Sequence, residues 1–345
     1  MRIDLHKIPQ ASPDDVSSLA ALIRQGTLNP AHIIAILGKT EGNGCVNDFT
    51  RGFATQTLKT YLATHIGEAA AKQIVYIMSG GTEGVLSPHL NVFTRQEDTG
   101  RSPHWGLVMG VSRTRSFEPE EIGSLAMVEA VSQAVREALE EAGLTPENVH
   151  FVQIKCPLVQ ASREGGFQGS SYQSMASSRG AAALGVALAL EELKPEQITP
   201  AVIGRDFSVY SKTASTSAGV ELQNCEIFVL GNAAHATGTL VVGHAVMQHA
   251  LDVAAVQRAI AHTGQPAERL INIFAKAEAD PRGIVLGRRH TMLDDSDISH
   301  TRMCRAVVGA VVAAVAQDPM VYVSGGSEHQ GPPGGGPVAV ISRMA

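Results

Sequence analysis

The sequence is poor in features that mark several large protein classes. Only 4% of its 345 residues are aromatic, 17% are charged, and no basic run stands out in a net charge of −6. Stacking platforms and basic patches for nucleic acids are therefore not expected. The longest apolar run, from Ala306 to Ala316, is well short of the ~20 residues that span a bilayer. We expect neither a nucleic-acid partner nor a membrane.

Metal-binding and redox motifs are also missing. The 4 cysteines lie far apart without a CxxC pair, and the 13 histidines include no HExxH motif. These absences exclude zinc knuckles and typical zinc hydrolases, and they favour a reduced, cytoplasmic protein. The Gly38-Lys39-Thr40 segment lacks the first glycine of a phosphate-binding loop, because that position is Ile33.

What the chain does contain is one pattern repeated three times. A helical stretch and a proline-containing turn lead into an apolar strand that ends in a lysine, namely Lys39, Lys155 and Lys276. The prolines that precede these lysines by nine or ten residues are Pro30, Pro146 and Pro266. Such regular recurrence indicates internal triplication.

Each lysine is followed by a polar loop and then by an arginine in an alanine-rich helix. These arginines are Arg51, Arg179 and Arg302. The residues before them, Thr50, Ser178 and Thr301, are expected to be the N-caps of these helices.

A Ser-[Gly/Ala]-Gly-x-Glu motif then closes each repeat. It starts at Ser79, Ser217 and Ser324 and is followed by another apolar strand. The glycines permit tight turns and a close approach of the backbone to a ligand. We expect an α+β fold of three units, at residues 1–101, 105–237 and 243–345.

Three units around an axis would bring three serines, three lysines and three arginines to one centre. A desolvated lysine can act as the base that activates a serine, and arginine binds carbonyl oxygens or developing oxyanions. Such a centre suits a small planar ligand with several carbonyl groups and near-threefold symmetry. The alternative is that these residues serve only turns and strand ends.

Several stretches closely resemble the ring-opening amidohydrolases, the family of cyanuric acid hydrolase and barbiturase. They are GKTEGNGCVNDFTRGFAT, MSGGTEGVLSPH, KCPL, SMASSRGAAALGVALAL, FAKAEADP and SGGSEHQGPPGGGP. The resemblance implies three α/β repeats with pseudo-threefold symmetry, arranged as a barrel-like prism with the active site on the axis. It also implies a homotetramer that opens a cyclic amide without a catalytic cofactor. The motifs resemble those of the members that act on cyanuric acid more than those of the barbiturases. The alternatives are action on barbituric acid and an inactive threefold module that only binds a ligand.

The same resemblance assigns roles to residues. Lys155 and Ser217 match the catalytic base and nucleophile, although Ser211 and Ser215 lie near Ser217. The residues that match substrate contacts are Arg51, Ser79, Gly80, Arg179, Ser217, Ala218, Arg302, Ser324 and Gly325, with Lys39 and Lys276. The segment from Gln160 to Ser174 is shorter than expected for the family, so the resemblance does not determine which residues form this edge of the site.

A structural cation is a further expectation. A loop rich in glycine and proline can present several backbone carbonyls to a hard cation. By resemblance, the residues that hold Mg²⁺ or Ca²⁺ are Glu278, Ser327, Gln330, Gly331, Pro332 and Gly335.

The three repeats differ at the second residue after each lysine. Lys39 and Lys276 are followed there by Glu41 and Glu278, whereas Lys155 is followed by Pro157. A carboxylate at that distance on an extended segment raises the pKa of a lysine. We therefore expect Lys155 to be the lysine that is most easily kept neutral, and Ser217 to be the nucleophile.

Overall fold

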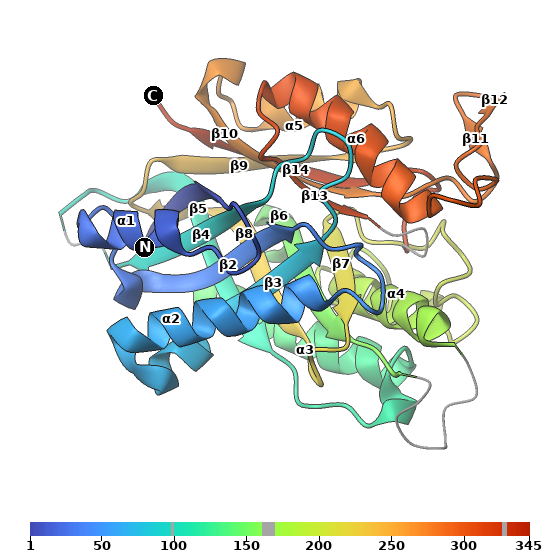
Figure 1. Ribbon diagram of the computed structural model, residues 1–345, viewed down its shortest axis with the longest axis horizontal. Helices are drawn as coiled ribbons and strands as arrows, with labels where there is room; N and C mark the ends of the chain where they lie inside the picture. Colours follow the sequence, from blue (N-terminus) through green and yellow to red (C-terminus); the bar gives the residue numbers. More distant parts are fainter. Residues whose placement is uncertain (98–99, 161–169, 326–329) are drawn as a thin grey trace.

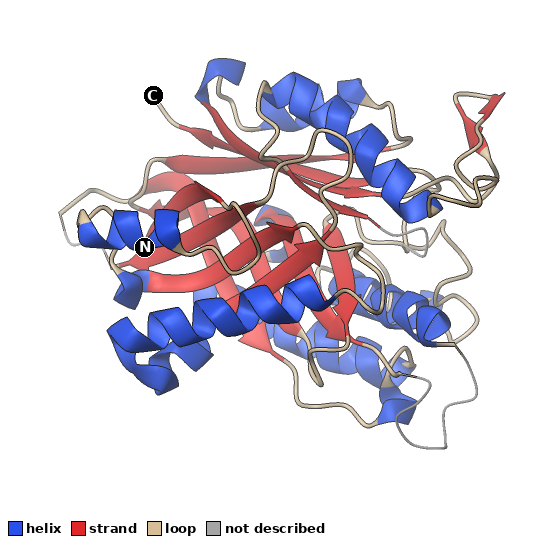
Figure 2. Cartoon of the chain, viewed as in Figure 1, coloured by secondary structure: helices blue, strands red, loops and turns tan. Residues whose placement is uncertain are grey.

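The computed structural model describes the whole chain except residues 98–99, 161–169 and 326–329 (Figure 1). Three four-stranded sheets form its centre, and helices cover their outer sides (Figure 2). The first sheet has the strand order β1-β4-β2-β3. Its unit contains β1 (Arg2–Pro9), α1 (Ser17–Arg24), η1 (Pro30–His32), β2 (Ile33–Thr40), α2 (Phe49–Gln73), β3 (Val75–Gly80) and β4 (His89–Gln96).

The second sheet has the corresponding order β5-β8-β6-β7. Its unit contains β5 (His104–Arg113), η2 (Pro119–Glu121), α3 (Leu125–Ala142), η3 (Pro146–Asn148), β6 (Val149–Pro157), α4 (Ser171–Ala189), η4 (Pro195–Gln197), β7 (Ala214–Gly219) and β8 (Glu226–Ala236).

The third sheet has the order β9-β14-β10-β13, which is again the same arrangement. Its unit contains β9 (Leu240–Met247), α5 (Val253–His262), η5 (Ala267–Arg269), β10 (Leu270–Ala277), α6 (His300–Ala316), β13 (Tyr322–Gly325) and β14 (Gly336–Arg343). A small hairpin of β11 (Ile284–Val285) and β12 (Arg288–Arg289) projects from it.

The register of the parallel strand pairs repeats as well. The lysine of each unit lies directly opposite its serine, in the pairs Lys39–Ser79, Lys155–Ser217 and Lys276–Ser324. Directly paired residues of adjacent strands project from the same face of a sheet. The three similar sheets thus fit the expected repeats, whereas the exact unit boundaries remain predictions.

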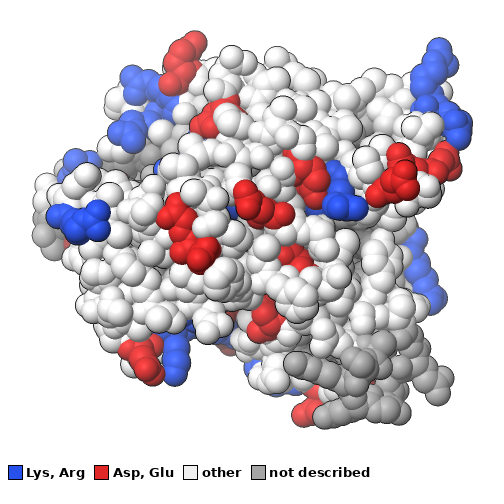
Figure 3. All heavy atoms as spheres, viewed as in Figure 1, with Lys and Arg blue, Asp and Glu red and all other residues white. Residues whose placement is uncertain are grey.

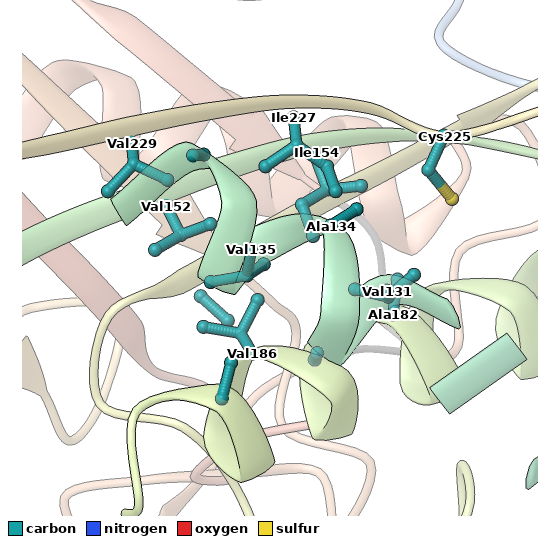
Figure 4. Packing of buried hydrophobic residues seen from close by; sticks show 14 of the residues in the cluster. Val131, Ala134, Val135, Val152, Ile154, Ala182, Val186, Cys225, Ile227 and Val229 are labelled. Carbon is teal, nitrogen blue, oxygen red and sulfur yellow. The ribbon is translucent and has the colours of Figure 1, made fainter. Parts of the chain in front are cut away.

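Each sheet is apolar on both faces, since one face packs under helices and the other meets the neighbouring sheets. Figure 4 shows the helix-covered side of the second sheet, where side chains from β6 and β8 meet those from α3 and α4. On the inner side, the few aromatic residues gather where the sheets meet. The ring centroids of Phe93 and Phe228 lie 4.8 Å apart, and those of Phe151 and Phe274 lie 5.9 Å apart. Burial of each such ring stabilises the fold by about 1.5–3 kcal/mol.

The arginine-bearing helices begin before the positions that the sequence suggested. The expected N-caps Thr50, Ser178 and Thr301 lie inside their helices, because α2, α4 and α6 begin at Phe49, Ser171 and His300. Asp48 and Ser170 cap α2 and α4 through side-chain oxygens that accept backbone N–H groups. Polar residues earlier in the loop therefore took the capping role, and Ser299 occupies the N-cap position of α6.

Charged side chains are scattered on the face drawn in Figure 3, which shows no basic cluster. No helix in the described part of the chain is long and apolar enough to cross a membrane.

Candidate active site

Three buried lysines lie at the ends of equivalent strands and link the three sheets in a closed ring. Each ammonium group donates to the backbone carbonyl of the residue that precedes the serine of another unit. The bonds run from Lys39 to Val323 (2.8 Å), from Lys155 to Met78 (3.1 Å) and from Lys276 to Thr216 (3.0 Å). The structure therefore brings all three predicted lysines to one centre, beside all three serine-bearing strands.

The three serines differ in their hydrogen bonds. Ser79 Oγ lies 3.4 Å from Lys39 Nζ, whereas Ser217 Oγ makes a long 3.5 Å contact with the Ile154 carbonyl. Ser324 Oγ is buried without a hydrogen-bond partner in the described part of the chain. Ser217 is 8% exposed, Ser79 5% and Ser324 1%, so Ser217 is the most accessible of the three.

In the first two units, the glutamate at the end of the serine motif binds an arginine of a neighbouring unit. Glu221 lies 3.4 Å from Arg51 Nε, and Glu83 lies 2.6 Å from Arg305 Nη2. Arg305, on α6, is therefore the equivalent of Arg51, on α2, although the sequence pattern had indicated Arg302. Arg302 is only partly buried, and Arg305 is 1% exposed. Glu328, which ends the third motif, lies outside the described residues.

Arg179 is also buried, on α4. Its Nη2 lies 2.8 Å from the Met175 sulfur, and its backbone carbonyl accepts a hydrogen bond from the Thr216 hydroxyl on the serine strand. The arginine helix of the second unit is thus fixed to the strand that carries Ser217.

The glycines after Ser79 are required by close contacts. A Cβ on Gly80 would lie 1.7 Å from the Asp48 carboxylate, and one on Gly81 would lie 2.5 Å from the Arg305 guanidinium. Asp48 also accepts the backbone N–H of Gly44 at 2.8 Å. Sequence reasoning missed both Asp48 and Arg305, because their partners lie in other loops or in another unit.

Burial strongly perturbs the lysines. Desolvation, reinforced by Arg305, holds the pKa of Lys39 well below its usual value. Desolvation also lowers the pKa of Lys155, to about 8. Repulsion by Arg51 lowers it further, and the attraction of Glu221 offsets only part of this shift. Lys155 is therefore about half neutral near pH 8, and a minor neutral fraction remains near pH 7.

One expectation about these charges was wrong. Lys155 does have a carboxylate neighbour, since Glu221 Oε1 lies 3.2 Å from its Nζ. Conversely, Glu41 is exposed at the surface. Only Lys276 has the expected partner, Glu278, at 3.1 Å. Contacts across strands, rather than spacing along one strand, therefore decide which lysine is paired.

The residues of the expected cation site lie near the end of β10. Glu278 is buried beside Lys276, and a Cβ on Gly336 would lie 2.4 Å from the Lys276 carbonyl, so the segment that leads into β14 passes this strand end. The Gln330 amide holds the 204–209 loop through Gly204, Asp206 and Val209. Ser327 lies outside the described residues. A buried carboxylate with backbone carbonyls is an all-oxygen donor set, which suits Mg²⁺ or Ca²⁺.

Comparison with known proteins identifies the family. Residues 4–343 match the family described as "Amidohydrolase ring-opening protein". A cyanuric acid amidohydrolase of Enterobacter cloacae is 49% identical over 370 residues, which cover 100% of both chains. A cyclic amide hydrolase of Azorhizobium caulinodans is 48% identical and covers 99% of this chain and 100% of its own.

Solved structures agree with these matches. A structure described under "Cyanuric acid hydrolase: evolutionary innovation by structural concatenation" superposes with a TM-score of 0.93 at 46% identity, covering 99% of each chain. One from A. caulinodans, also described as that hydrolase, has a TM-score of 0.93 at 48% identity and covers 100% of this chain and 99% of its own. The chain therefore belongs to the ring-opening amidohydrolase family, whose members hydrolyse cyclic amides.

Proposed function

We propose that the protein hydrolyses cyanuric acid to 1-carboxybiuret, which loses CO₂ to give biuret. The observation that carries this proposal is the ring of three lysines, each beside a serine and joined to the serine strand of another unit. Cyanuric acid is a planar ring in which three carbonyls alternate with three N–H groups. A site with three similar sets of donors and acceptors matches that alternation, and pseudo-threefold symmetry of a barrel-like prism is part of the proposal.

In this mechanism Ser217 is the nucleophile and Lys155 is the base. Neutral Lys155 takes the proton of Ser217 Oγ as this oxygen bonds to a ring carbonyl carbon. The carbon–nitrogen bond then breaks, and the lysine returns the proton to the leaving nitrogen. Water hydrolyses the resulting ester and frees Ser217.

Two features favour this dyad over the other two. Burial lowers the pKa of Lys155 to about 8, which is close to the working pH, where a base is most effective. Ser217 is also the most exposed of the three serines. One observation favours the first dyad instead, because Lys39 Nζ lies 3.4 Å from Ser79 Oγ, and this is the only such hydrogen bond between a lysine and its paired serine in the described part of the chain.

The remaining residues bind and polarise the substrate. Ser79, Gly80, Ala218, Ser324 and Gly325 hold the carbonyl edges. The cations around the ring are Lys39, Lys276, Arg51, Arg179 and either Arg302 or Arg305, and Arg305 has the geometry that matches Arg51. A cation held by Glu278 and the 330–335 carbonyls would stabilise the strand end, and we assign it no chemical step. A cytoplasmic homotetramer completes the proposal.

Direct assay separates the candidate activities. The purified protein is incubated with cyanuric acid and with barbituric acid, and loss of ring absorbance is followed. Faster turnover of cyanuric acid supports the proposal, whereas faster turnover of barbituric acid would identify a barbiturase that forms ureidomalonate. Thermal stabilisation by both compounds without turnover would indicate an inactive binding module.

A further inference from the structure

A chamber of about 270 Å³ lies between α2 and the second sheet, behind Lys155. One face of α2 lines it with small or polar residues at helical spacing, which are Gly52, Thr55, Gln56, Lys59 and Thr60. Positions separated by three, four, seven and eight residues share one face of a helix. One continuous face of α2 therefore forms a wall of this rear chamber.

The rear chamber runs from solvent to the Lys155–Glu221 ion pair. Gln56 and Thr60 are exposed and form its outer rim, whereas Lys155 is buried at its inner end. Glu226, directly opposite Lys155 across β6 and β8, adds a second carboxylate to the wall. A space of this size with polar groups on its walls is large enough for ordered water.

The corresponding places in the other two units are filled. On α4, a Cβ on Gly180 would lie 3.0 Å from the Gly204 nitrogen and 3.2 Å from Ile203. On α6, the residue after Arg305 is Ala306, whose Cβ would lie 3.2 Å from a Cβ on Gly84. On α2, by contrast, a Cβ on Gly52 would meet nothing within 4 Å. The helix faces that follow Arg179 and Arg305 are thus packed, and the face that follows Arg51 is open.

We propose that the rear chamber delivers the hydrolytic water to Lys155, an inference that rests on the function proposed above. The substrate fills the side of the site that faces the three serines, so the water for the second step needs another approach. Lys155 takes a proton from this water as the hydroxide oxygen bonds to the ester carbonyl carbon. The bond from that carbon to Ser217 Oγ breaks, and Lys155 returns the proton to Ser217.

Filling the chamber separates the two halves of the reaction. Gly52→Leu places a side chain in the chamber without a backbone clash, and Ala63→Leu adds the same group to α2 outside it. We expect Gly52→Leu to retain the first turnover but to lower the steady-state rate at least ~10-fold, which corresponds to about 1.4 kcal/mol. Intact-mass analysis after rapid quenching should then show an ester adduct on Ser217, while Ala63→Leu behaves like the wild type.

A second variant protects the test against misfolding. Gln56→Trp blocks the exposed rim, and we expect the same accumulation of adduct. Wild-type turnover in both chamber variants would overturn the inference, and so would equal loss of the first turnover and the steady-state rate. Failure of the proposed function looks different, because the wild type itself would then not turn over cyanuric acid.

Discussion

The charge of Glu221 should set the pH at which the enzyme becomes active. Burial lowers the pKa of Lys155 to about 8, and Glu221, at 3.2 Å, works against that shift by stabilising the ammonium form. Replacement by glutamine removes the negative charge but keeps the shape of the side chain. It also leaves the repulsion from Arg51 unopposed. Both effects favour neutral Lys155.

The expected shift in the pKa of Lys155 can be bounded from its distance to Glu221. An opposite charge within about 4–6 Å typically shifts a pKa by about 1–3 units, and each unit corresponds to about 1.4 kcal/mol. In the wild type, kcat should rise with pH through an acid limb near 8, as Lys155 loses its proton. In Glu221→Gln this limb should move down by about 1 unit or more, which raises relative activity at pH 6–7.

The assay is a pH profile of kcat between pH 5.5 and 10 in buffers of constant ionic strength. Glu83→Gln is the matched control, since Glu83 ends the equivalent serine motif and pairs with Arg305 as Glu221 pairs with Arg51, whereas the ion pair of Lys155 is with Glu221. This control is expected to raise KM and to leave the limb in place. An unmoved or upward-shifted limb in Glu221→Gln would refute the assignment of Lys155 as the base.

Three further predictions concern the dyad, the arginines and the cation. Ser217→Ala and Lys155→Ala should each abolish measurable turnover but still bind cyanuric acid in calorimetry, and the double variant should lose little more, because the two residues act as one unit; a substantial rate in Ser217→Ala would place the chemistry at another serine. Arg305→Ala should raise KM and lower the melting temperature much more than Arg302→Ala, because it leaves the Glu83 carboxylate without its cation, which costs about 3–5 kcal/mol of stability. Equal effects would show that both arginines serve the site. Chelation should lower the melting temperature while activity at moderate temperature persists, and loss of turnover that only added metal restores would assign the ion to catalysis.

Sequence reasoning succeeded where the information is local and repeated. The spacing of proline and lysine, and the recurrence of the serine motif, identified three strand pairs whose register the structure reproduces. Alternation of apolar residues is encoded within a few positions, so a strand and its terminal lysine can be identified without knowledge of the neighbouring sheets.

It failed where the deciding contact crosses between units. Arg302 and Arg305 both lie near the start of α6, and the ion pair with Glu83 of another unit is made by Arg305, while a substrate contact by Arg302 stays a prediction. The partner of Lys155 was missed for a related reason, since Glu221 reaches it from the end of β7 rather than from β6 itself. Local spacing contains no information about either contact.

The closed ring of lysines has a consequence for biosynthesis. Lys39 emerges early from the ribosome, but the carbonyl that accepts its hydrogen bond belongs to Val323, 284 residues later. In a nascent chain, the Lys39 ammonium group consequently lacks this hydrogen-bond acceptor until the last strands have been translated. Contacts of such long range form slowly, so the catalytic centre is assembled at the end of folding and a prematurely terminated chain cannot acquire it.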